Sequence, residues 1–167
     1  MVRDLFAAIL VALSTPTLAI DAPQQHKDFC ARSPAHCERI GTLDRMELNI
    51  YRLAELDEVN RIVNRTVRPR PDVGPDVWEY PRSGAGDCED FAIKKRAMLI
   101  NKGWSSSQLL LTIVHTGTEG HAVLLARTSG GDFVLDNMTD SVMKPSATGY
   151  TFMARQSHVN PVAWVSY

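Results

Sequence analysis

Apolar positions between residues 43 and 62 recur at helical spacing, and charged residues of both signs occupy the positions between them. The apolar set is Leu43, Met46, Ile50, Leu53, Leu56, Val59 and Ile62. This repeat is typical of an amphipathic helix that packs one face on a core. We predict a helix that starts at Asp44, with Glu47 completing a variant of the capping box, and that fades near Thr66.

A stretch rich in proline and glycine, residues 67–86, follows this helix and predicts a long loop. The next apolar stripe contains Phe91, Ala92, Met98 and Leu99. Gly103 suits the position just after a helix C-terminus. We therefore predict a second helix over residues 88–101.

The pattern changes after residue 107 to short runs of apolar and β-branched residues. These runs are 109–115, 121–127, 132–136, 150–154 and 163–167, and Ser129-Gly130-Gly131 is a hairpin turn between two of them. We predict an antiparallel sheet of four or five strands, with the 88–101 helix packed across it. The predicted fold class is α+β, with N-terminal helices packed on an antiparallel sheet.

Length and charge narrow the classes of function. The chain has 167 residues, which suits one domain with a sizeable core. Its formal net charge is −1, so it lacks the basic excess of a nucleic-acid-binding protein, and no glycine-rich phosphate loop points to a nucleotide, flavin or haem site. We expect a monomer.

The first residues have the organisation of an export signal. Arg3 lies in a short charged region, residues 5–13 are apolar, and Thr17-Leu18-Ala19 is a fair cleavage site. The alternative is a buried N-terminal helix. We predict a signal peptide at 1–19, an N-terminal arm at 20–41 and a catalytic domain at 42–167, in a periplasmic or secreted protein.

Export changes how the three cysteines are interpreted. In an oxidising compartment Cys30 and Cys37 are natural disulfide partners, and we expect them to pin an extended arm. Cys88 is then left as a free thiol. A buried, inert cysteine is the alternative, but the acidic, glycine-flanked setting of Cys88 favours a reactive one. No CxxC pair is present, so the cysteines are not a zinc set.

Cys88 lies where a loop ends and a helix begins, and the partial positive charge of a helix N-terminus favours a thiolate. His121 starts one predicted strand and Asp136 ends the next, so both lie at the same edge of an antiparallel sheet. We predict Cys88 as nucleophile, His121 as base and Asp136 as the residue that orients the base.

Other residues compete weakly for these roles. His115 ends the preceding strand and is the rival base. Asp132 and Asp140 are rivals to Asp136, which could also be a strand-end residue that bonds its own backbone. The remaining histidines, for which we expect structural or surface roles, are His26, His36 and His158.

Three acids, Asp87, Glu89 and Asp90, flank the predicted nucleophile. Carboxylates beside a thiol raise its pKa and oppose thiolate formation. They could simply complement the dipole of the helix and face solvent. They could instead bind a hard cation such as calcium, which would neutralise the local charge. The residues alone leave both explanations open.

Three segments, GDCEDFAIKKRAML, GHAVLL and FVLDNMTD, together resemble the bacterial transglutaminase-like cysteine proteinase family. The resemblance covers roughly residues 45–160. It implies a papain-like, transglutaminase-like fold, with Cys88, His121 and Asp136 in the roles given above. It also implies calcium dependence, with Asp87 and Glu89 as the first ligands and Asp90 as the second choice.

The function that the resemblance implies is an exported cysteine endopeptidase acting on a surface or periplasmic protein. Similar proteases release surface adhesins during biofilm dispersal, and an inner-membrane protein sequesters them. The alternatives are an acyl transferase of the transglutaminase type and a catalytically idle binding module stabilised by calcium.

Overall fold

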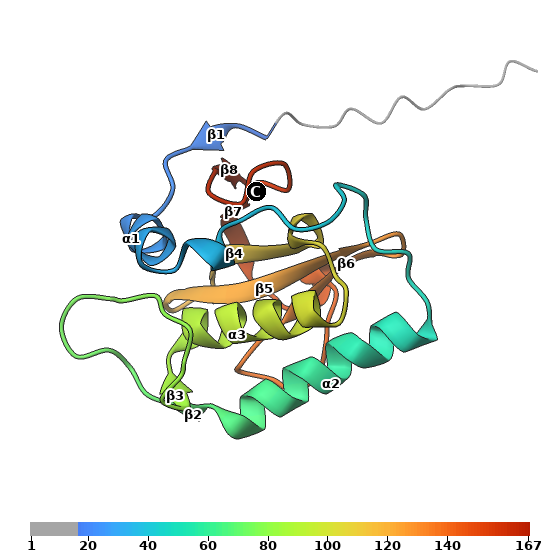
Figure 1. Cartoon of the computed structure of the whole chain (residues 1–167). Helices are drawn as coiled ribbons and strands as arrows, with labels where there is room; N and C mark the ends of the chain where they lie inside the picture. Colours follow the sequence, from blue (N-terminus) through green and yellow to red (C-terminus); the bar gives the residue numbers. More distant parts are fainter. Residues whose placement is uncertain (1–16) are drawn as a thin grey trace, which may run out of the picture.

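One antiparallel sheet organises the protein, whose computed structural model describes residues 17–167 (Figure 1). Its strand order is β1-β8-β7-β4-β5-β6. The strands are β1 (Ala19–Ile20), β4 (Leu109–His115), β5 (Gly120–Thr128), β6 (Gly131–Leu135), β7 (Thr151–Gln156) and β8 (Trp164–Ser166). The predicted antiparallel sheet is therefore confirmed, with β1 as an additional edge strand.

Among the described residues, three α-helices accompany the sheet: α1 (Gln24–Arg32), α2 (Ile50–Thr66) and α3 (Cys88–Asn101). Two short parallel strands, β2 (Arg68–Pro69) and β3 (Ala85–Gly86), form a separate pair. Single 3-10 turns occur at Pro34–His36, Ser106–Gln108 and Pro145–Ala147. Within residues 17–167, no helix has the length and apolar character needed to span a membrane. The predicted export signal lies almost wholly outside the described residues.

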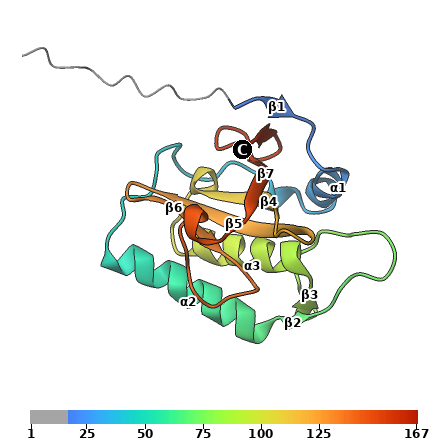
Figure 2. The same cartoon turned by 180° about the vertical axis from the view of Figure 1, so that it is seen from behind.

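Helix α3 lies between the sheet and α2, as both views show (Figures 1 and 2). Its apolar side chains pack with those of α2 and with one face of the sheet, and the main core contains Phe91, Leu99, Leu56 and Leu124. A smaller cluster that includes Val123 covers the other face of the sheet. The predicted α+β fold, with the cysteine-bearing helix across the sheet, is confirmed.

The prediction that helix α2 starts at Asp44 was wrong. Helix α2 begins at Ile50, because Asn49 caps it: the Asn49 side chain accepts hydrogen bonds from the backbone N–H groups of Tyr51 and Arg52 at 3.0 and 2.9 Å. The preceding residues run alongside the β5–β6 hairpin. Met46 donates its N–H to Arg127 O at 3.1 Å, which holds this segment out of the helix.

The expectation of an extended N-terminal arm was also wrong. Residues 24–32 form α1, because two side chains on one face of this helix, His26 and Phe29, are buried in the protein. The His26 ring lies edge-on to Trp78 and Trp164, and its Nδ1 accepts a hydrogen bond from Trp164 Nε1 at 3.1 Å. Cys30 and Cys37 form the expected disulfide.

We predict that Asn49→Ala lowers the free energy of unfolding by about 1 kcal/mol, because it leaves two N–H groups of the first turn of α2 without their cap. Asp44→Ala is the matched control, since Asp44 is outside the helix and should leave stability unchanged. Urea unfolding of both variants checks this. Equal losses in the two variants would contradict the assignment of the cap.

We also predict a pH-dependent loss of stability from His26. Burial first, and the charge of Arg96 second, lower the pKa of His26 from 6.5 to about 4. Below pH 6.5 the unfolded chain therefore binds a proton that the folded chain does not, so stability falls by on the order of 3 kcal/mol as the pH drops to 4.

Urea unfolding at a series of pH values should show this loss in the wild-type protein and not in His26→Gln. Substitution of the exposed His115 by glutamine should leave the wild-type pH dependence in place. If His26→Gln loses as much stability between pH 6.5 and 4 as the wild type, burial of a neutral imidazole is not the cause.

Candidate active site

Cys88 is the first residue of α3, and it is held there by a tight turn from β3 into the helix. Gly86 permits this turn, because a Cβ at this position would lie 2.3 Å from Asp90 Oδ2. Asp90 itself accepts a hydrogen bond from the backbone N–H of Glu79 at 2.8 Å, which ties the loop before the helix to its first turn. The thiol is thus presented at the N-terminus of a buried helix.

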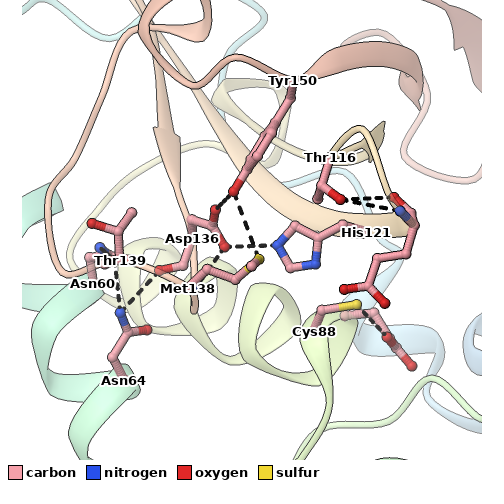
Figure 3. A network of polar contacts seen from close by, with 11 residues as sticks. Asn60, Asn64, Cys88, Thr116, His121, Asp136, Met138, Thr139 and Tyr150 are labelled. Atoms are coloured by element: carbon pink, nitrogen blue, oxygen red, sulfur yellow. Dashed lines mark hydrogen bonds and ion pairs between the residues drawn. The ribbon is translucent and has the colours of Figure 1, made fainter.

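His121 and Asp136 lie next to each other at one edge of the sheet, as the order of the predicted strands indicated. His121 Nε2 lies 2.8 Å from Asp136 Oδ1, and the two side chains are 7% and 0% exposed. Because Nε2 bonds the carboxylate, the other ring nitrogen, Nδ1, is turned toward the sulfur of Cys88 (Figure 3). The structure therefore brings together all three residues of the predicted triad.

Two further donors hold the Asp136 carboxylate. The Tyr150 hydroxyl donates to Oδ2 at 2.7 Å, and the backbone N–H of Met138 donates to Oδ1 at 3.0 Å (Figure 3). Burial alone would raise the pKa of Asp136, but the hydrogen bonds from His121, Met138 and Tyr150 outweigh it and lower this pKa. The sequence analysis missed Tyr150, because nothing in the local pattern shows that its hydroxyl reaches this aspartate.

The rival residues lie elsewhere. His115 accepts a hydrogen bond from the N–H of Gly117 in the exposed β4–β5 turn. Asp132 pairs with Arg45. Asp140 accepts a hydrogen bond from Asn64 at 3.1 Å. None of these contacts involves Cys88 or His121.

Two cavities adjoin at Cys88 and His121. One, of about 280 Å³, is lined also by Arg70, Gly86, Asn137 and Met138, among other residues. The other, of about 270 Å³, is lined also by Asp76, Trp78, Glu89 and Ile113, among other residues. Both cavities adjoin the thiol, so a substrate bound in either can reach it.

The immediate electrostatics of Cys88 oppose thiolate formation. The thiol donates to Glu89 Oε2 at 3.3 Å. Burial first, and the Glu89 carboxylate second, raise the pKa of Cys88 to about 12, although the backbone N–H of Ala122 acts in the opposite direction. Positive charge beside the thiol would therefore favour the thiolate that a nucleophile requires.

Four carboxylates beside the thiol form an acidic cluster: Asp72, Asp76, Asp87 and Glu89. One oxygen from each lies within 4.8 Å of all the others. Asp87 Oδ1 and Glu89 Oε1 are buried without a hydrogen-bond partner among the described residues. Burial first, and the neighbouring carboxyl groups of Asp87 and Asp76 second, raise the pKa of Glu89 to about 10.

This donor set fits calcium, which prefers several carboxylate oxygens and would satisfy the two that lack partners. Of the acids singled out in the sequence, Asp87 and Glu89 are in the cluster, whereas Asp90 is outside it and bonds the backbone of Glu79. Asp72 and Asp76 were missed, because they lie in the proline-rich loop, where spacing gives no indication of which side chains turn inward.

The chain matches the family model described as bacterial transglutaminase-like cysteine proteinase BTLCP over residues 17–167. A comparison with curated proteins gave no match. Among solved structures, Legionella pneumophila LapG is similar, with a TM-score of 0.55 and 28% identity over 61% of this chain and 63% of LapG.

Two other LapG structures match as well. The calcium-bound form has a TM-score of 0.60 and 25% identity, over 71% of each chain. The EGTA-treated form has a TM-score of 0.55 and 28% identity, over 61% of each chain. These matches confirm the transglutaminase-like fold.

The chain spans less than two thirds of LapG in the first of these matches. The family model, by contrast, reaches from the first to the last residue that the structure describes. The chain therefore belongs to the bacterial transglutaminase-like cysteine proteinase family.

Proposed function

We propose that this protein is an exported cysteine endopeptidase that cleaves a periplasmic or surface protein. The observation that carries the proposal is that Cys88 and His121 line both adjoining cavities, with Asp136 bonded to His121. Membership of a proteinase family agrees with it. By analogy with the similar proteases, the substrate class is a surface adhesin, and an inner-membrane protein is the regulatory partner.

In the proposed reaction the Cys88 thiolate attacks the carbonyl carbon of the peptide bond, and the first-turn N–H groups of α3 stabilise the resulting oxyanion. His121, protonated in its ion pair with the thiolate, gives that proton to the leaving amine. A thioester remains on Cys88. Water then attacks the thioester while His121 accepts its proton, which releases the carboxylic acid and restores the thiolate.

Asp136 keeps the imidazole in one orientation throughout, because its bond to Nε2 leaves Nδ1 facing the sulfur. Tyr150 and the Met138 amide keep the carboxylate from rotating, since each of its oxygens is already held by a donor. The base is therefore positioned before substrate arrives.

We further propose that the acidic cluster binds calcium and that activity depends on it. The calcium-bound form of LapG and the unpaired buried oxygens of Asp87 and Glu89 support this. Bound calcium would supply positive charge beside the thiol. Asp72 and Asp76 come from the loop and Asp87 and Glu89 from the start of α3, so the cluster would also join the loop to the helix.

We predict that His121→Ala slows alkylation of Cys88 by iodoacetamide at pH 7 with calcium by on the order of 100-fold, because the thiolate loses its imidazolium partner. His115→Ala is the matched control and should react at the wild-type rate. Equal rates in wild type and His121→Ala would make Cys88 an ordinary thiol, which is the expectation for an idle binding module.

We predict that Cys88→Ala abolishes proteolysis while the fold stays intact, because the nucleophile is removed. Surface proteins extracted from the source cells are incubated with each form, and mass spectrometry identifies new protein N-termini. Circular dichroism checks the fold of the variant. Cleavage that persists in Cys88→Ala would refute the proposal, and incorporation of an added amine into substrate glutamines would indicate an acyl transferase.

We predict that Asp76→Asn weakens calcium binding by at least about tenfold, because it removes one carboxylate of the cluster. Asp90→Asn should bind like the wild type, since Asp90 lies outside the cluster and an amide oxygen can still accept the Glu79 N–H. Isothermal titration calorimetry measures both affinities. The opposite ranking would favour the ligand set implied by the sequence resemblance over the cluster in the structure.

A further inference from the structure

Lys95 is a lysine in the middle of the core. It lies on α3 seven residues, about two turns, after Cys88, and its side chain is 0% exposed. Its Nζ has no hydrogen-bond partner among the described residues, and it lies 5.9 Å from the centroid of the Phe91 ring. A charged group buried in this way strongly disfavours the folded state unless something nearby interacts with it.

The carboxylates whose charges act on Lys95 are Asp136 and Asp140. Burial lowers the pKa of Lys95 to about 7, and these two charges oppose that shift. Neither carboxylate lies within salt-bridge distance of it. Both belong to the segment after β6, residues 136–140, which we call the aspartate loop. The charge of the triad aspartate, Asp136, therefore acts on Lys95.

Helix α2 holds the aspartate loop through two asparagines (Figure 3). Asn60 Nδ2 donates to Thr139 O at 2.9 Å. Asn64 Nδ2 lies 3.0 Å from both Asp136 O and Thr139 O. The side-chain nitrogens of Asn60 and Asn64 thus bond the loop, and the side-chain oxygen of each remains able to accept a hydrogen bond from another group.

Three amide oxygens in this region lack that donor. Asn60 Oδ1, Asn64 Oδ1 and Asn137 Oδ1 are all buried without a hydrogen-bond partner in the part of the chain that the structure describes. An ammonium group offers three N–H donors and no acceptor. Buried polar groups in native proteins are almost always bonded, either directly or through a buried water. The unpartnered oxygens lie on the aspartate loop and on α2, which packs against α3, the helix that carries the unpartnered donors of Lys95.

We propose that Lys95 is a positioning residue, whose ammonium group donates to these asparagine oxygens through buried water and so fixes the aspartate loop. Its role in cleavage rests on the proposed protease function. The loop in turn sets Asp136, which orients His121 toward Cys88. Lys95 touches neither substrate nor the reacting atoms.

The test replaces Lys95 with methionine, which has nearly the same shape and no N–H donors. Lys94→Met is the matched control, because it removes the same charge from the neighbouring, partly exposed position. The first readout is the proton NMR signal of the His121 Nε2–H group, which reports the bond to Asp136 without any substrate. The second is the rate of Cys88 alkylation by iodoacetamide at pH 7 with calcium.

We expect Lys95→Met to remain folded, to shift and broaden the His121 signal, and to alkylate about tenfold more slowly than the wild type. Lys94→Met should match the wild type in both. Lys95→Gln, which keeps N–H donors without the charge, should restore most of the signal. A wild-type signal and rate in Lys95→Met would overturn the proposal, since a purely structural lysine changes stability and leaves these readouts alone.

If Lys95→Met fails to fold, Asn137→Ala removes one proposed acceptor and leaves the bonds from Asn60 and Asn64 in place, and it should displace the same signal; an unchanged signal overturns the proposal. Failure of the protease function is separately visible. It would appear as a wild-type Cys88 that reacts like an ordinary thiol in alkylation and is indifferent to His121→Ala. The His121 signal still decides the role of Lys95 in that case.

Discussion

The site depends on the burial of α3 between the sheet and α2. A helix exposed on one side can shift on its support, whereas α3 has core neighbours on the faces that meet the sheet and α2. Close packing leaves such a helix only one position. Its first turn is therefore fixed relative to the edge of β5, and Cys88 is fixed relative to His121.

Burial of α3 also brings an electrostatic conflict. The turn that presents Cys88 carries Asp87 and Glu89, and the loop before it adds Asp72 and Asp76. As the side chains stand, this charge and burial raise the pKa of the thiol and keep it protonated. The same carboxylates are a suitable ligand set for calcium. Under our proposal the conflict is the means of control, because the thiol becomes reactive only when a cation offsets the acids.

Asp136, at the other end of the triad from Cys88, is surrounded by hydrogen-bond donors and not by acids. Hydrogen bonds from His121, Met138 and Tyr150 outweigh the burial of Asp136 and lower its pKa, so Asp136 stays ionised. Asn60 and Asn64 link the aspartate loop to α2, so this helix holds the loop that carries the residue orienting the base. The helices thus determine the geometry of the site as well as the core.

The local pattern of apolar and polar residues determined the helix and strands that carry the triad. A switch from helical to alternating periodicity is a short-range property, so the sequence alone predicted α3, the β4–β5–β6 strands and the alignment of His121 with Asp136. It was wrong where a distant partner decided the outcome. The pairing of Met46 with Arg127 delays the start of α2, and Trp164 and Trp78 convert the expected extended arm into α1. Only the tertiary structure brought Tyr150, Asp72 and Asp76 to the site, because contacts across the chain leave no periodicity in the sequence.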